Sequence, residues 1–72
     1  MPSLDLLAEV ALLRDLPDRG LVRGQVGTVV ETLSSDAFEV EFCDESGRTY
    51  ATAALRAEDL VRLRRSPLER VA

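Results

Sequence analysis

The chain has 72 residues, 13 acidic and nine basic, with one cysteine, no histidine and a formal net charge of −4. That length allows one domain with a thin core, too small to hold a deep active-site cleft as well. One cysteine without histidine excludes a disulfide framework and the usual zinc sites, and no apolar run approaches the roughly 20 residues of a membrane-spanning helix. Because the N-terminus also lacks the basic start of a signal peptide, we expect a cytoplasmic protein without metal or cofactor.

The charge is unevenly distributed along the chain. Residues 1–55 carry ten acids and four arginines, a net −6, whereas residues 56–72 carry three acids and five arginines, a net +2. A domain that is acidic overall lacks the electrostatic footprint that supplies most non-specific affinity for nucleic acid. The composition therefore favours a protein partner over nucleic acid.

An alternation of apolar residues opens the chain and predicts a half-buried strand over Glu9–Leu13. The residues that share its apolar face are Leu4, Leu6, Ala8, Val10 and Leu12. The alternative is a helix that would group Leu4 with Leu7, Ala8 and Ala11, but no capping glycine supports it.

The segment Arg14–Gln25 predicts a long loop. Pro17 presets its own φ and Gly20 tolerates a positive φ, so the run Pro17–Gly20 predicts a β-turn. Leu21 and Val22 are apolar, so at least one of them should pack back onto the β-barrel that the following strands predict.

The second predicted strand is Val26–Leu33. Gly27, Val29 and Glu31 share one of its faces if the alternation is regular. A glycine inside a strand is costly unless the backbone bends or another chain passes close to it, so Gly27 predicts a barrel corner.

Strict alternation marks Ala37–Cys43 as the third strand. Its apolar residues must face the core and its acids the solvent. The two sets are Phe38, Val40 and Phe42 on one side, and Glu39 and Glu41 on the other. The run Asp44–Gly47 then predicts a hairpin turn into a fourth strand, Arg48–Leu55.

The last part of the domain is shorter. Arg56–Asp59 predicts one 3-10 turn, and Leu60–Arg64 predicts a fifth strand. Alternation along this strand predicts that Val61 and Leu63 point inward and that Arg62 and Arg64 point outward. Residues 66–72 then form a short tail in which Ser66 is a candidate N-cap, so the domain itself spans residues 1–65.

These elements follow the order of an SH3-like barrel: a long loop after the first strand, tight turns between the next three, and a helical turn before the last. We therefore predict an all-β fold, a small five-stranded SH3-like barrel with one short 3-10 turn before its last strand.

Three stretches carry a resemblance to a known family: DLPDRGLVRGQVGTVV at 15–30, FEVEF at 38–42 and DESGRTY at 44–50. Together they resemble a family of small uncharacterised bacterial proteins, a domain of unknown function with an SH3-like barrel. The resemblance implies the fold and assigns no catalytic or binding residue. A looser similarity, to the barrel of the nitrile hydratase beta subunit and to KOW-type barrels, is confined to the glycine-rich stretch.

Glu39 and Glu41 form the clearest candidate surface. Their carboxylates point the same way about 7 Å apart, a separation compatible with acid–base chemistry or a hard cation. Nothing in the sequence supplies a pocket or a nucleophile beside them, so the simplest interpretation is a solvated strand face and the next is a partner-binding face. Cys43 is followed by two acids, which disfavour a reactive thiolate.

The only basic cluster consists of Arg56, Arg62, Arg64 and Arg65. These side chains could bind phosphate, but binding of single-stranded RNA pairs basic groups with stacking aromatics, which are scarce here. Charged residues on a last strand also protect a sheet edge from pairing with another sheet. One tyrosine, Tyr50, cannot line a polyproline groove.

We therefore predict a non-enzymatic protein-interaction or accessory module. The alternatives are a nucleic-acid-associated KOW-like barrel and a small acidic partner protein of the immunity or antitoxin kind. Self-association through an edge strand is a further hypothesis. The candidate partner contacts are Asp18, Arg19, Leu21, Glu39, Glu41, Arg62 and Arg64.

Overall fold

The computed structural model describes residues 4–64, so the predicted tail 66–72 with its candidate N-cap Ser66 lies outside the described residues. All strand pairings are antiparallel and join one sheet of order β4-β3-β2-β1-β5. The strands are β1 (Glu9–Leu12), β2 (Val26–Ser34), β3 (Ala37–Cys43), β4 (Thr49–Arg56) and β5 (Leu60–Arg62), with 3-10 turns η1 (Pro17–Arg19) and η2 (Ala57–Asp59). The predicted all-β class, the five strands and the 3-10 turn before the last strand are confirmed.

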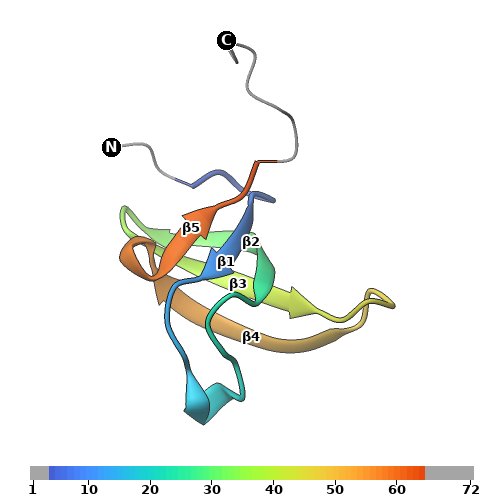
Figure 1. Ribbon diagram of the computed structural model, residues 1–72. Helices are drawn as coiled ribbons and strands as arrows, with labels where there is room; N and C mark the ends of the chain where they lie inside the picture. Colours follow the sequence, from blue (N-terminus) through green and yellow to red (C-terminus); the bar gives the residue numbers. More distant parts are fainter. Residues whose placement is uncertain (1–3, 65–72) are drawn as a thin grey trace, which may run out of the picture.

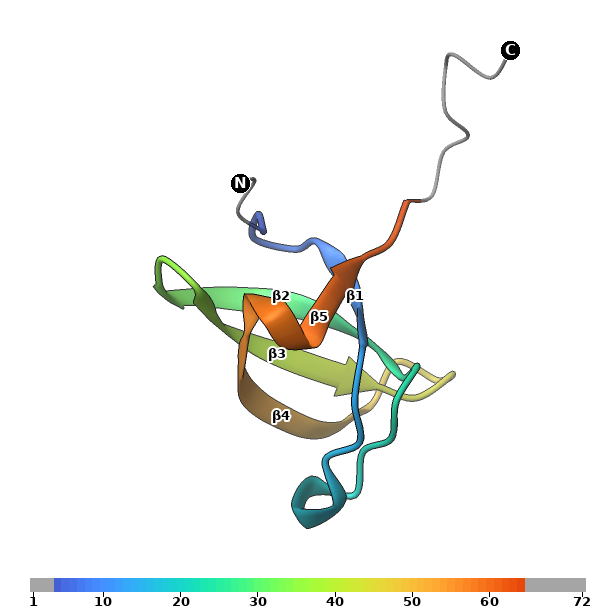
Figure 2. The same ribbon diagram turned by 60° about the vertical axis from the view of Figure 1, so that its left-hand side comes forward.

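Strand β2 connects two halves of the sheet. Its residues Val26–Thr28 pair with β1, and the register from Thr28 to Ser34 runs along β3. As a result β1 and β5 lie across β3 and β4 rather than beside them (Figures 1 and 2). The pairing order leaves β4 and β5 as edges, so the sheet is not closed within residues 4–64 and the barrel stays a prediction.

The core lies between these two halves. The predicted inward set of β3 is confirmed, because Phe38, Val40 and Phe42 are all buried. Residues from the other four strands join them in one cluster, together with two residues from outside the strands, Ala8 and Leu21. The strand residues are Val10, Leu12, Val29, Ala53, Leu55 and Leu60. In the long loop Leu21 is fully buried and Val22 is 55% exposed. The prediction that at least one of the two packs inward is therefore confirmed.

Gly27 lies where β2 passes close to β3. An ideal Cβ at this position would lie 2.7 Å from Val40 Cγ1, 2.9 Å from the Glu41 carbonyl oxygen and 2.9 Å from Phe42 Cδ2. The backbone of a paired strand cannot move aside as a flexible side chain can. The prediction that a side chain at Gly27 would clash is therefore confirmed, whereas the barrel corner stays a prediction.

The long loop is folded on itself. Leu16 and Leu21 exchange N–H···O=C hydrogen bonds of 2.8 and 3.1 Å, which close a narrow neck. Between them η1 carries Pro17 at its start, and Gly20 follows it with a φ of +70°. The predicted turn at Pro17–Gly20 is present as this 3-10 turn, because proline suits the first helical position and glycine the left-handed one.

The predicted parity of the last strand is wrong. Val61 is 43% exposed, whereas Leu60 is buried. Leu60 pairs in register with Leu12, a core residue of β1, and directly opposed residues share a face of the sheet. The strand also ends at Arg62 rather than Arg64.

The apolar alternation before β1 also breaks down. Leu6 is exposed because the chain turns at Leu6 and Leu7, and Leu7 adopts a φ of +69° while its N–H donates to the Val29 carbonyl. The face that continues into the core therefore begins at Ala8, and Leu4 packs against the cluster from outside the strand.

Gly27→Ala should lower the free energy of unfolding by about 1–3 kcal/mol, because the added methyl group overpacks against the backbone of β3. Thr28→Val, one residue further along the strand, is the control and should change stability by less than about 0.5 kcal/mol. Urea unfolding followed by circular dichroism measures both. Equal stability of the glycine variant and wild type would contradict the close approach.

Phe42→Ala should cost about 3–5 kcal/mol, because it removes a fully buried aromatic ring and leaves a cavity. In a domain this small that is a large part of the total stability, so the variant should be mostly unfolded at 37 °C. Val22→Ala removes a comparably apolar but exposed side chain and should unfold like wild type. A folded Phe42→Ala domain with nearly unchanged stability would mean that Phe42 points towards the solvent and not into the core.

Candidate functional site

Three glutamates gather on the outer surface of β2 and β3, and we call them the acidic face: Glu31, Glu39 and Glu41. Glu31 lies directly opposite Glu39 in the register of the two strands. Glu41 lies two residues beyond Glu39, on the same side of β3, because its neighbours Val40 and Phe42 point into the core.

Glu31 is the member of the acidic face that sequence reasoning missed. A regular alternation predicts it on the same face as Gly27 and Val29, and this prediction is wrong. The register shifts between Val29, opposite Val40, and Glu31, opposite Glu39, so Val30 is an extra residue in a β-bulge. One extra residue moves Glu31 to the other face, and a second shift of the register follows between Thr32 and Ser34.

The carboxylates of the acidic face are not neutralised by arginine. Ion pairs join Arg14 to Asp59 (2.9 Å) and Arg62 to Asp5 (3.6 Å), and within residues 4–64 none reaches these three glutamates. Glu41 accepts a 2.8 Å hydrogen bond from the Thr49 hydroxyl. Like charges directly opposite one another on a sheet are destabilising, so the Glu31–Glu39 pair opposes folding.

Short side chains surround the acidic face. Thr28 on β2 and Thr52 on β4 flank Glu41 in register, and Ala54 on β4 lies beside Glu39. Glu31 is exposed, and Glu39 and Glu41 are half-buried among these small neighbours. Such a surface is suited to contact with a large partner rather than to enclosing a small molecule.

The long loop is attached to the outer edge of β4. The Arg19 guanidinium donates a 2.7 Å hydrogen bond to the Thr52 carbonyl, and Gln25 Nε2 donates a 2.9 Å bond to the Tyr50 hydroxyl. Arg19 is therefore held within the chain and blunts a sheet edge. Leu21 belongs to the core, so we leave it out of the contact surface, while Asp18 is exposed on η1.

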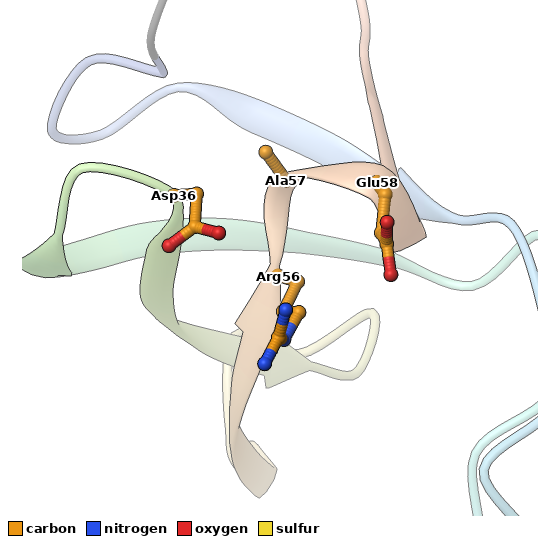
Figure 3. Close-up of a pocket in the computed structure, with 4 residues that line it drawn as sticks. All are labelled: Asp36, Arg56, Ala57 and Glu58. Carbon is orange, nitrogen blue, oxygen red and sulfur yellow. The ribbon is translucent and has the colours of Figure 1, made fainter.

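The structure describes three of the four arginines of the predicted basic cluster. Arg62 is engaged by Asp5, Arg64 is exposed at the end of the described range, and Arg65 lies beyond it. Arg56 lines a shallow pocket of about 260 Å³ with Asp36, Ala57 and Glu58 (Figure 3).

This pocket is a surface depression between two turns. The Ala57 N–H donates a 2.8 Å hydrogen bond to the Asp36 carbonyl, which brings η2 against the turn after β2. Asp36, Arg56 and Glu58 are all exposed, so the depression offers no desolvated group for catalysis. No set of three metal-binding side chains comes together in the described part of the chain, and no helix there is long and apolar enough to cross a membrane.

Asp44 organises the hairpin turn at the end of β3. Its Oδ1 accepts hydrogen bonds from the Ser46 hydroxyl (2.7 Å), the Ser46 N–H (2.9 Å) and the Arg48 N–H (3.0 Å). Gly47 completes the turn with a φ of +87°. These hydrogen bonds lower the pKa of Asp44 below its ordinary value of 3.8, and the bond from the Ser46 side chain has the largest effect. The hairpin turn predicted from Asp44–Gly47 is confirmed.

The fold and this surface define a small all-β domain whose candidate site is an exposed sheet face rather than a cleft. The chain belongs to the family described as Domain of unknown function (DUF4926), whose model matches residues 6–62. No curated protein and no solved structure matches the chain. Membership of a family of unknown function, implied by the sequence resemblance, is therefore confirmed.

The turn at Asp44 should make stability depend on acid pH. Because the folded pKa is depressed, this contribution is fully present above the ordinary aspartate pKa and is lost as the pH falls through the lower folded pKa. The melting-temperature difference between wild type and Asp44→Asn should therefore shrink between about pH 6 and about pH 2. Glu45→Gln removes a neighbouring carboxylate without these hydrogen bonds and should melt close to wild type. A difference that stays constant with pH would show that the charge on Asp44 contributes nothing.

Proposed function

We propose that this protein is a non-enzymatic interaction module that binds a basic protein partner through its acidic face. The observation that carries the proposal is the pairing of Glu31 directly opposite Glu39, with no ion pair between an arginine and either glutamate within residues 4–64. In the free domain this pair is repulsive, and a cationic partner would turn the repulsion into attraction. The arrangement thus favours the bound state over the free one.

The rest of the molecule supports a contact surface of this kind. The net charge of −4 attracts a basic partner over a distance and speeds its association. The side chains of Thr28, Thr52 and Ala54, which lie beside Glu41 and Glu39 in register, are short and leave room for a large partner. Asp18 lies on the loop attached to β4 by Arg19 and would extend the contact.

We also propose that the domain is an SH3-like barrel that works in the cytoplasm. The strand order, the long loop after β1 and η2 before β5 all follow the order expected of that fold. The contacts of Arg19 with Thr52 and of Gln25 with Tyr50 hold the long loop against β4. The free, exposed thiol of Cys43 fits a reducing compartment.

Nucleic-acid binding through the arginine side receives less support. Arg62 and Arg14 are engaged in ion pairs with carboxylates, which reduces the positive charge available to phosphate. An immunity- or antitoxin-like role is a special case of the proposal, in which the basic partner is a single tightly bound protein.

The test is capture of a partner from a lysate of the source organism, followed by calorimetric titration of the purified partner. Glu31→Gln with Glu39→Gln should weaken binding at least about tenfold and raise the melting temperature, because it removes both the attraction and the repulsion. The control pair Glu45→Gln with Glu58→Gln makes the same change in net charge away from the acidic face. Its affinity should stay within about twofold of wild type.

Two outcomes would contradict the proposal. Equal loss of affinity in both double variants would show that net charge, not the acidic face, attracts the partner. An eluate of nucleic acid that disappears steeply as salt rises would favour the arginine side instead.

A further inference from the structure

The outer edge of β4 is the longer of the two strand edges that the described sheet leaves unpaired. Within residues 4–64 β4 pairs only with β3, and it is eight residues long (Figure 1). The strand at the other edge, β5, has three residues. An unpaired edge presents a row of backbone N–H and C=O groups and is a template for pairing with another strand. The β4 edge is therefore the place at which this sheet can accept a further strand.

The register shows which backbone groups point out of this edge. In an antiparallel pair, successive residues direct their N–H and C=O groups alternately to the partner strand and away from it. The Thr52 carbonyl accepts a hydrogen bond from Arg19, so the backbone groups of Thr52 point outward. Those of Ala54 and Arg56 follow at alternate positions, because the register with β3 is regular from Ala51 to Arg56.

The side chains of β4 do not protect this edge. Natural edge strands are protected by charged residues, proline, bulges or short length. The sequence TYATAAL at 49–55 contains no charged residue, no proline and no glycine. The register shift in the pairing of β4 with β3 lies at the start of β4, close to Cys43. An uncharged segment of this length without proline is typical of segments that pair with other chains when their edge is exposed.

Arg19 covers the middle of this edge. Its guanidinium donates a 2.7 Å hydrogen bond to the Thr52 carbonyl, and a charged donor makes a stronger hydrogen bond than a neutral N–H. A strand added to β4 would lie about 4.8 Å away and would use the same carbonyl as an acceptor. Arg19 and an added strand therefore compete for one backbone group and for the space beside it.

The long loop holds Arg19 at this position. The turn η1 lies between Leu16 and Leu21, whose backbone hydrogen bonds close the neck of the loop, and Leu21 is fully buried. Gln25 binds the Tyr50 hydroxyl, a side-chain group near the start of β4. Because these contacts do not involve the Arg19 side chain, we expect the loop to stay anchored when that side chain is removed.

A second copy of β4 is a suitable strand for this edge. Antiparallel pairing about a two-fold axis at Ala53 places Thr52 opposite Ala54 of the second copy, and both side chains are short. Glu39 and Glu41 lie one strand further in, on β3. The two β3 strands would be three strand spacings apart, about 14 Å, which exceeds the Debye length of about 8 Å at physiological salt. The net charge of −4 therefore opposes this pairing only weakly.

We propose that the contact of Arg19 with Thr52 is autoinhibitory. It closes the β4 edge, and a second copy of the chain pairs β4 with β4 when the arginine is withdrawn. The pairing continues the sheet across a two-fold axis, in the order β2-β3-β4-β4-β3-β2. Neither the contact nor the pairing uses the carboxylates of the acidic face.

Sedimentation equilibrium of the purified chain over a range of concentrations tests the proposal. Arg19→Ala should dimerise with a dissociation constant at least about tenfold below that of wild type, because the edge is then open in every molecule. Arg23→Ala is the matched control, since it makes the same change in charge at an exposed position of the same loop. It should stay as monomeric as wild type.

A double variant tests whether the dimer forms through the β4 edge. Adding Thr52→Pro to Arg19→Ala should restore the monomer, because proline removes the outward N–H and β3 does not use that group. Circular dichroism checks that the double variant is folded.

Amide hydrogen exchange gives a second measurement that does not need the proline variant. The N–H groups of Thr52 and Ala54 should exchange rapidly in wild type and become protected in Arg19→Ala as the concentration rises. An Arg19→Ala chain that stays monomeric at the highest concentration would overturn the proposal, as would equally tight dimers of wild type or Arg23→Ala. Protection confined to strands other than β4 would overturn it as well.

Discussion

The close approach of β2 to β3 at Gly27 is the constraint on which the rest of the structure depends. A side chain at this position would collide with the Glu41 carbonyl and with two core side chains of β3. Without one, β2 can pair with β1 over its first residues and follow β3 over the rest. This sharing of one strand brings Val10 and Phe42 into the same core, which is all the core that a domain of this size can build.

The same strand gives the two outer surfaces their different chemistry. Val26, at its start, is an exposed apolar residue opposite Ala11 of β1, and Glu31, after the bulge, belongs to the acidic face. A β-bulge bends the strand and increases its twist. The strand therefore changes direction at the bulge, and its side chains change faces there. The separation of an apolar and an acidic surface therefore follows from the geometry of β2 together with the residues on either side of the bulge.

The loop between β1 and β2 acts as part of the scaffold. Its neck is closed by Leu16 and Leu21. Arg19 occupies one backbone acceptor of β4, the Thr52 carbonyl, and Gln25 binds the Tyr50 hydroxyl. An uncovered sheet edge is a template for pairing with other chains, so the cover directs contacts to the faces of the sheet. For this reason Arg19 is better understood as a structural residue than as a free contact residue.

Much of the fold could be predicted from the sequence because its causes are local. Strict alternation in β3 separates Phe38 from Glu39 since strand side chains alternate with a period of two, and Asp44 and Gly47 have the properties that a hairpin turn requires. Gly27 likewise announces a close approach before the neighbouring chain is known. These features determined the class of fold, the core of β3 and two of the three residues of the acidic face.

What the tertiary structure alone decided is register. No residue near Val30 signals the bulge that places Glu31 opposite Glu39, and the facing of Leu60 and Val61 depends on the pairing of β5 with β1, about 50 residues away in the chain. Register is set by which strands meet and how they are aligned, and a shift of one residue reverses every facing. The acidic face depends on such an alignment, so the sequence by itself could determine its residues but not bring them together.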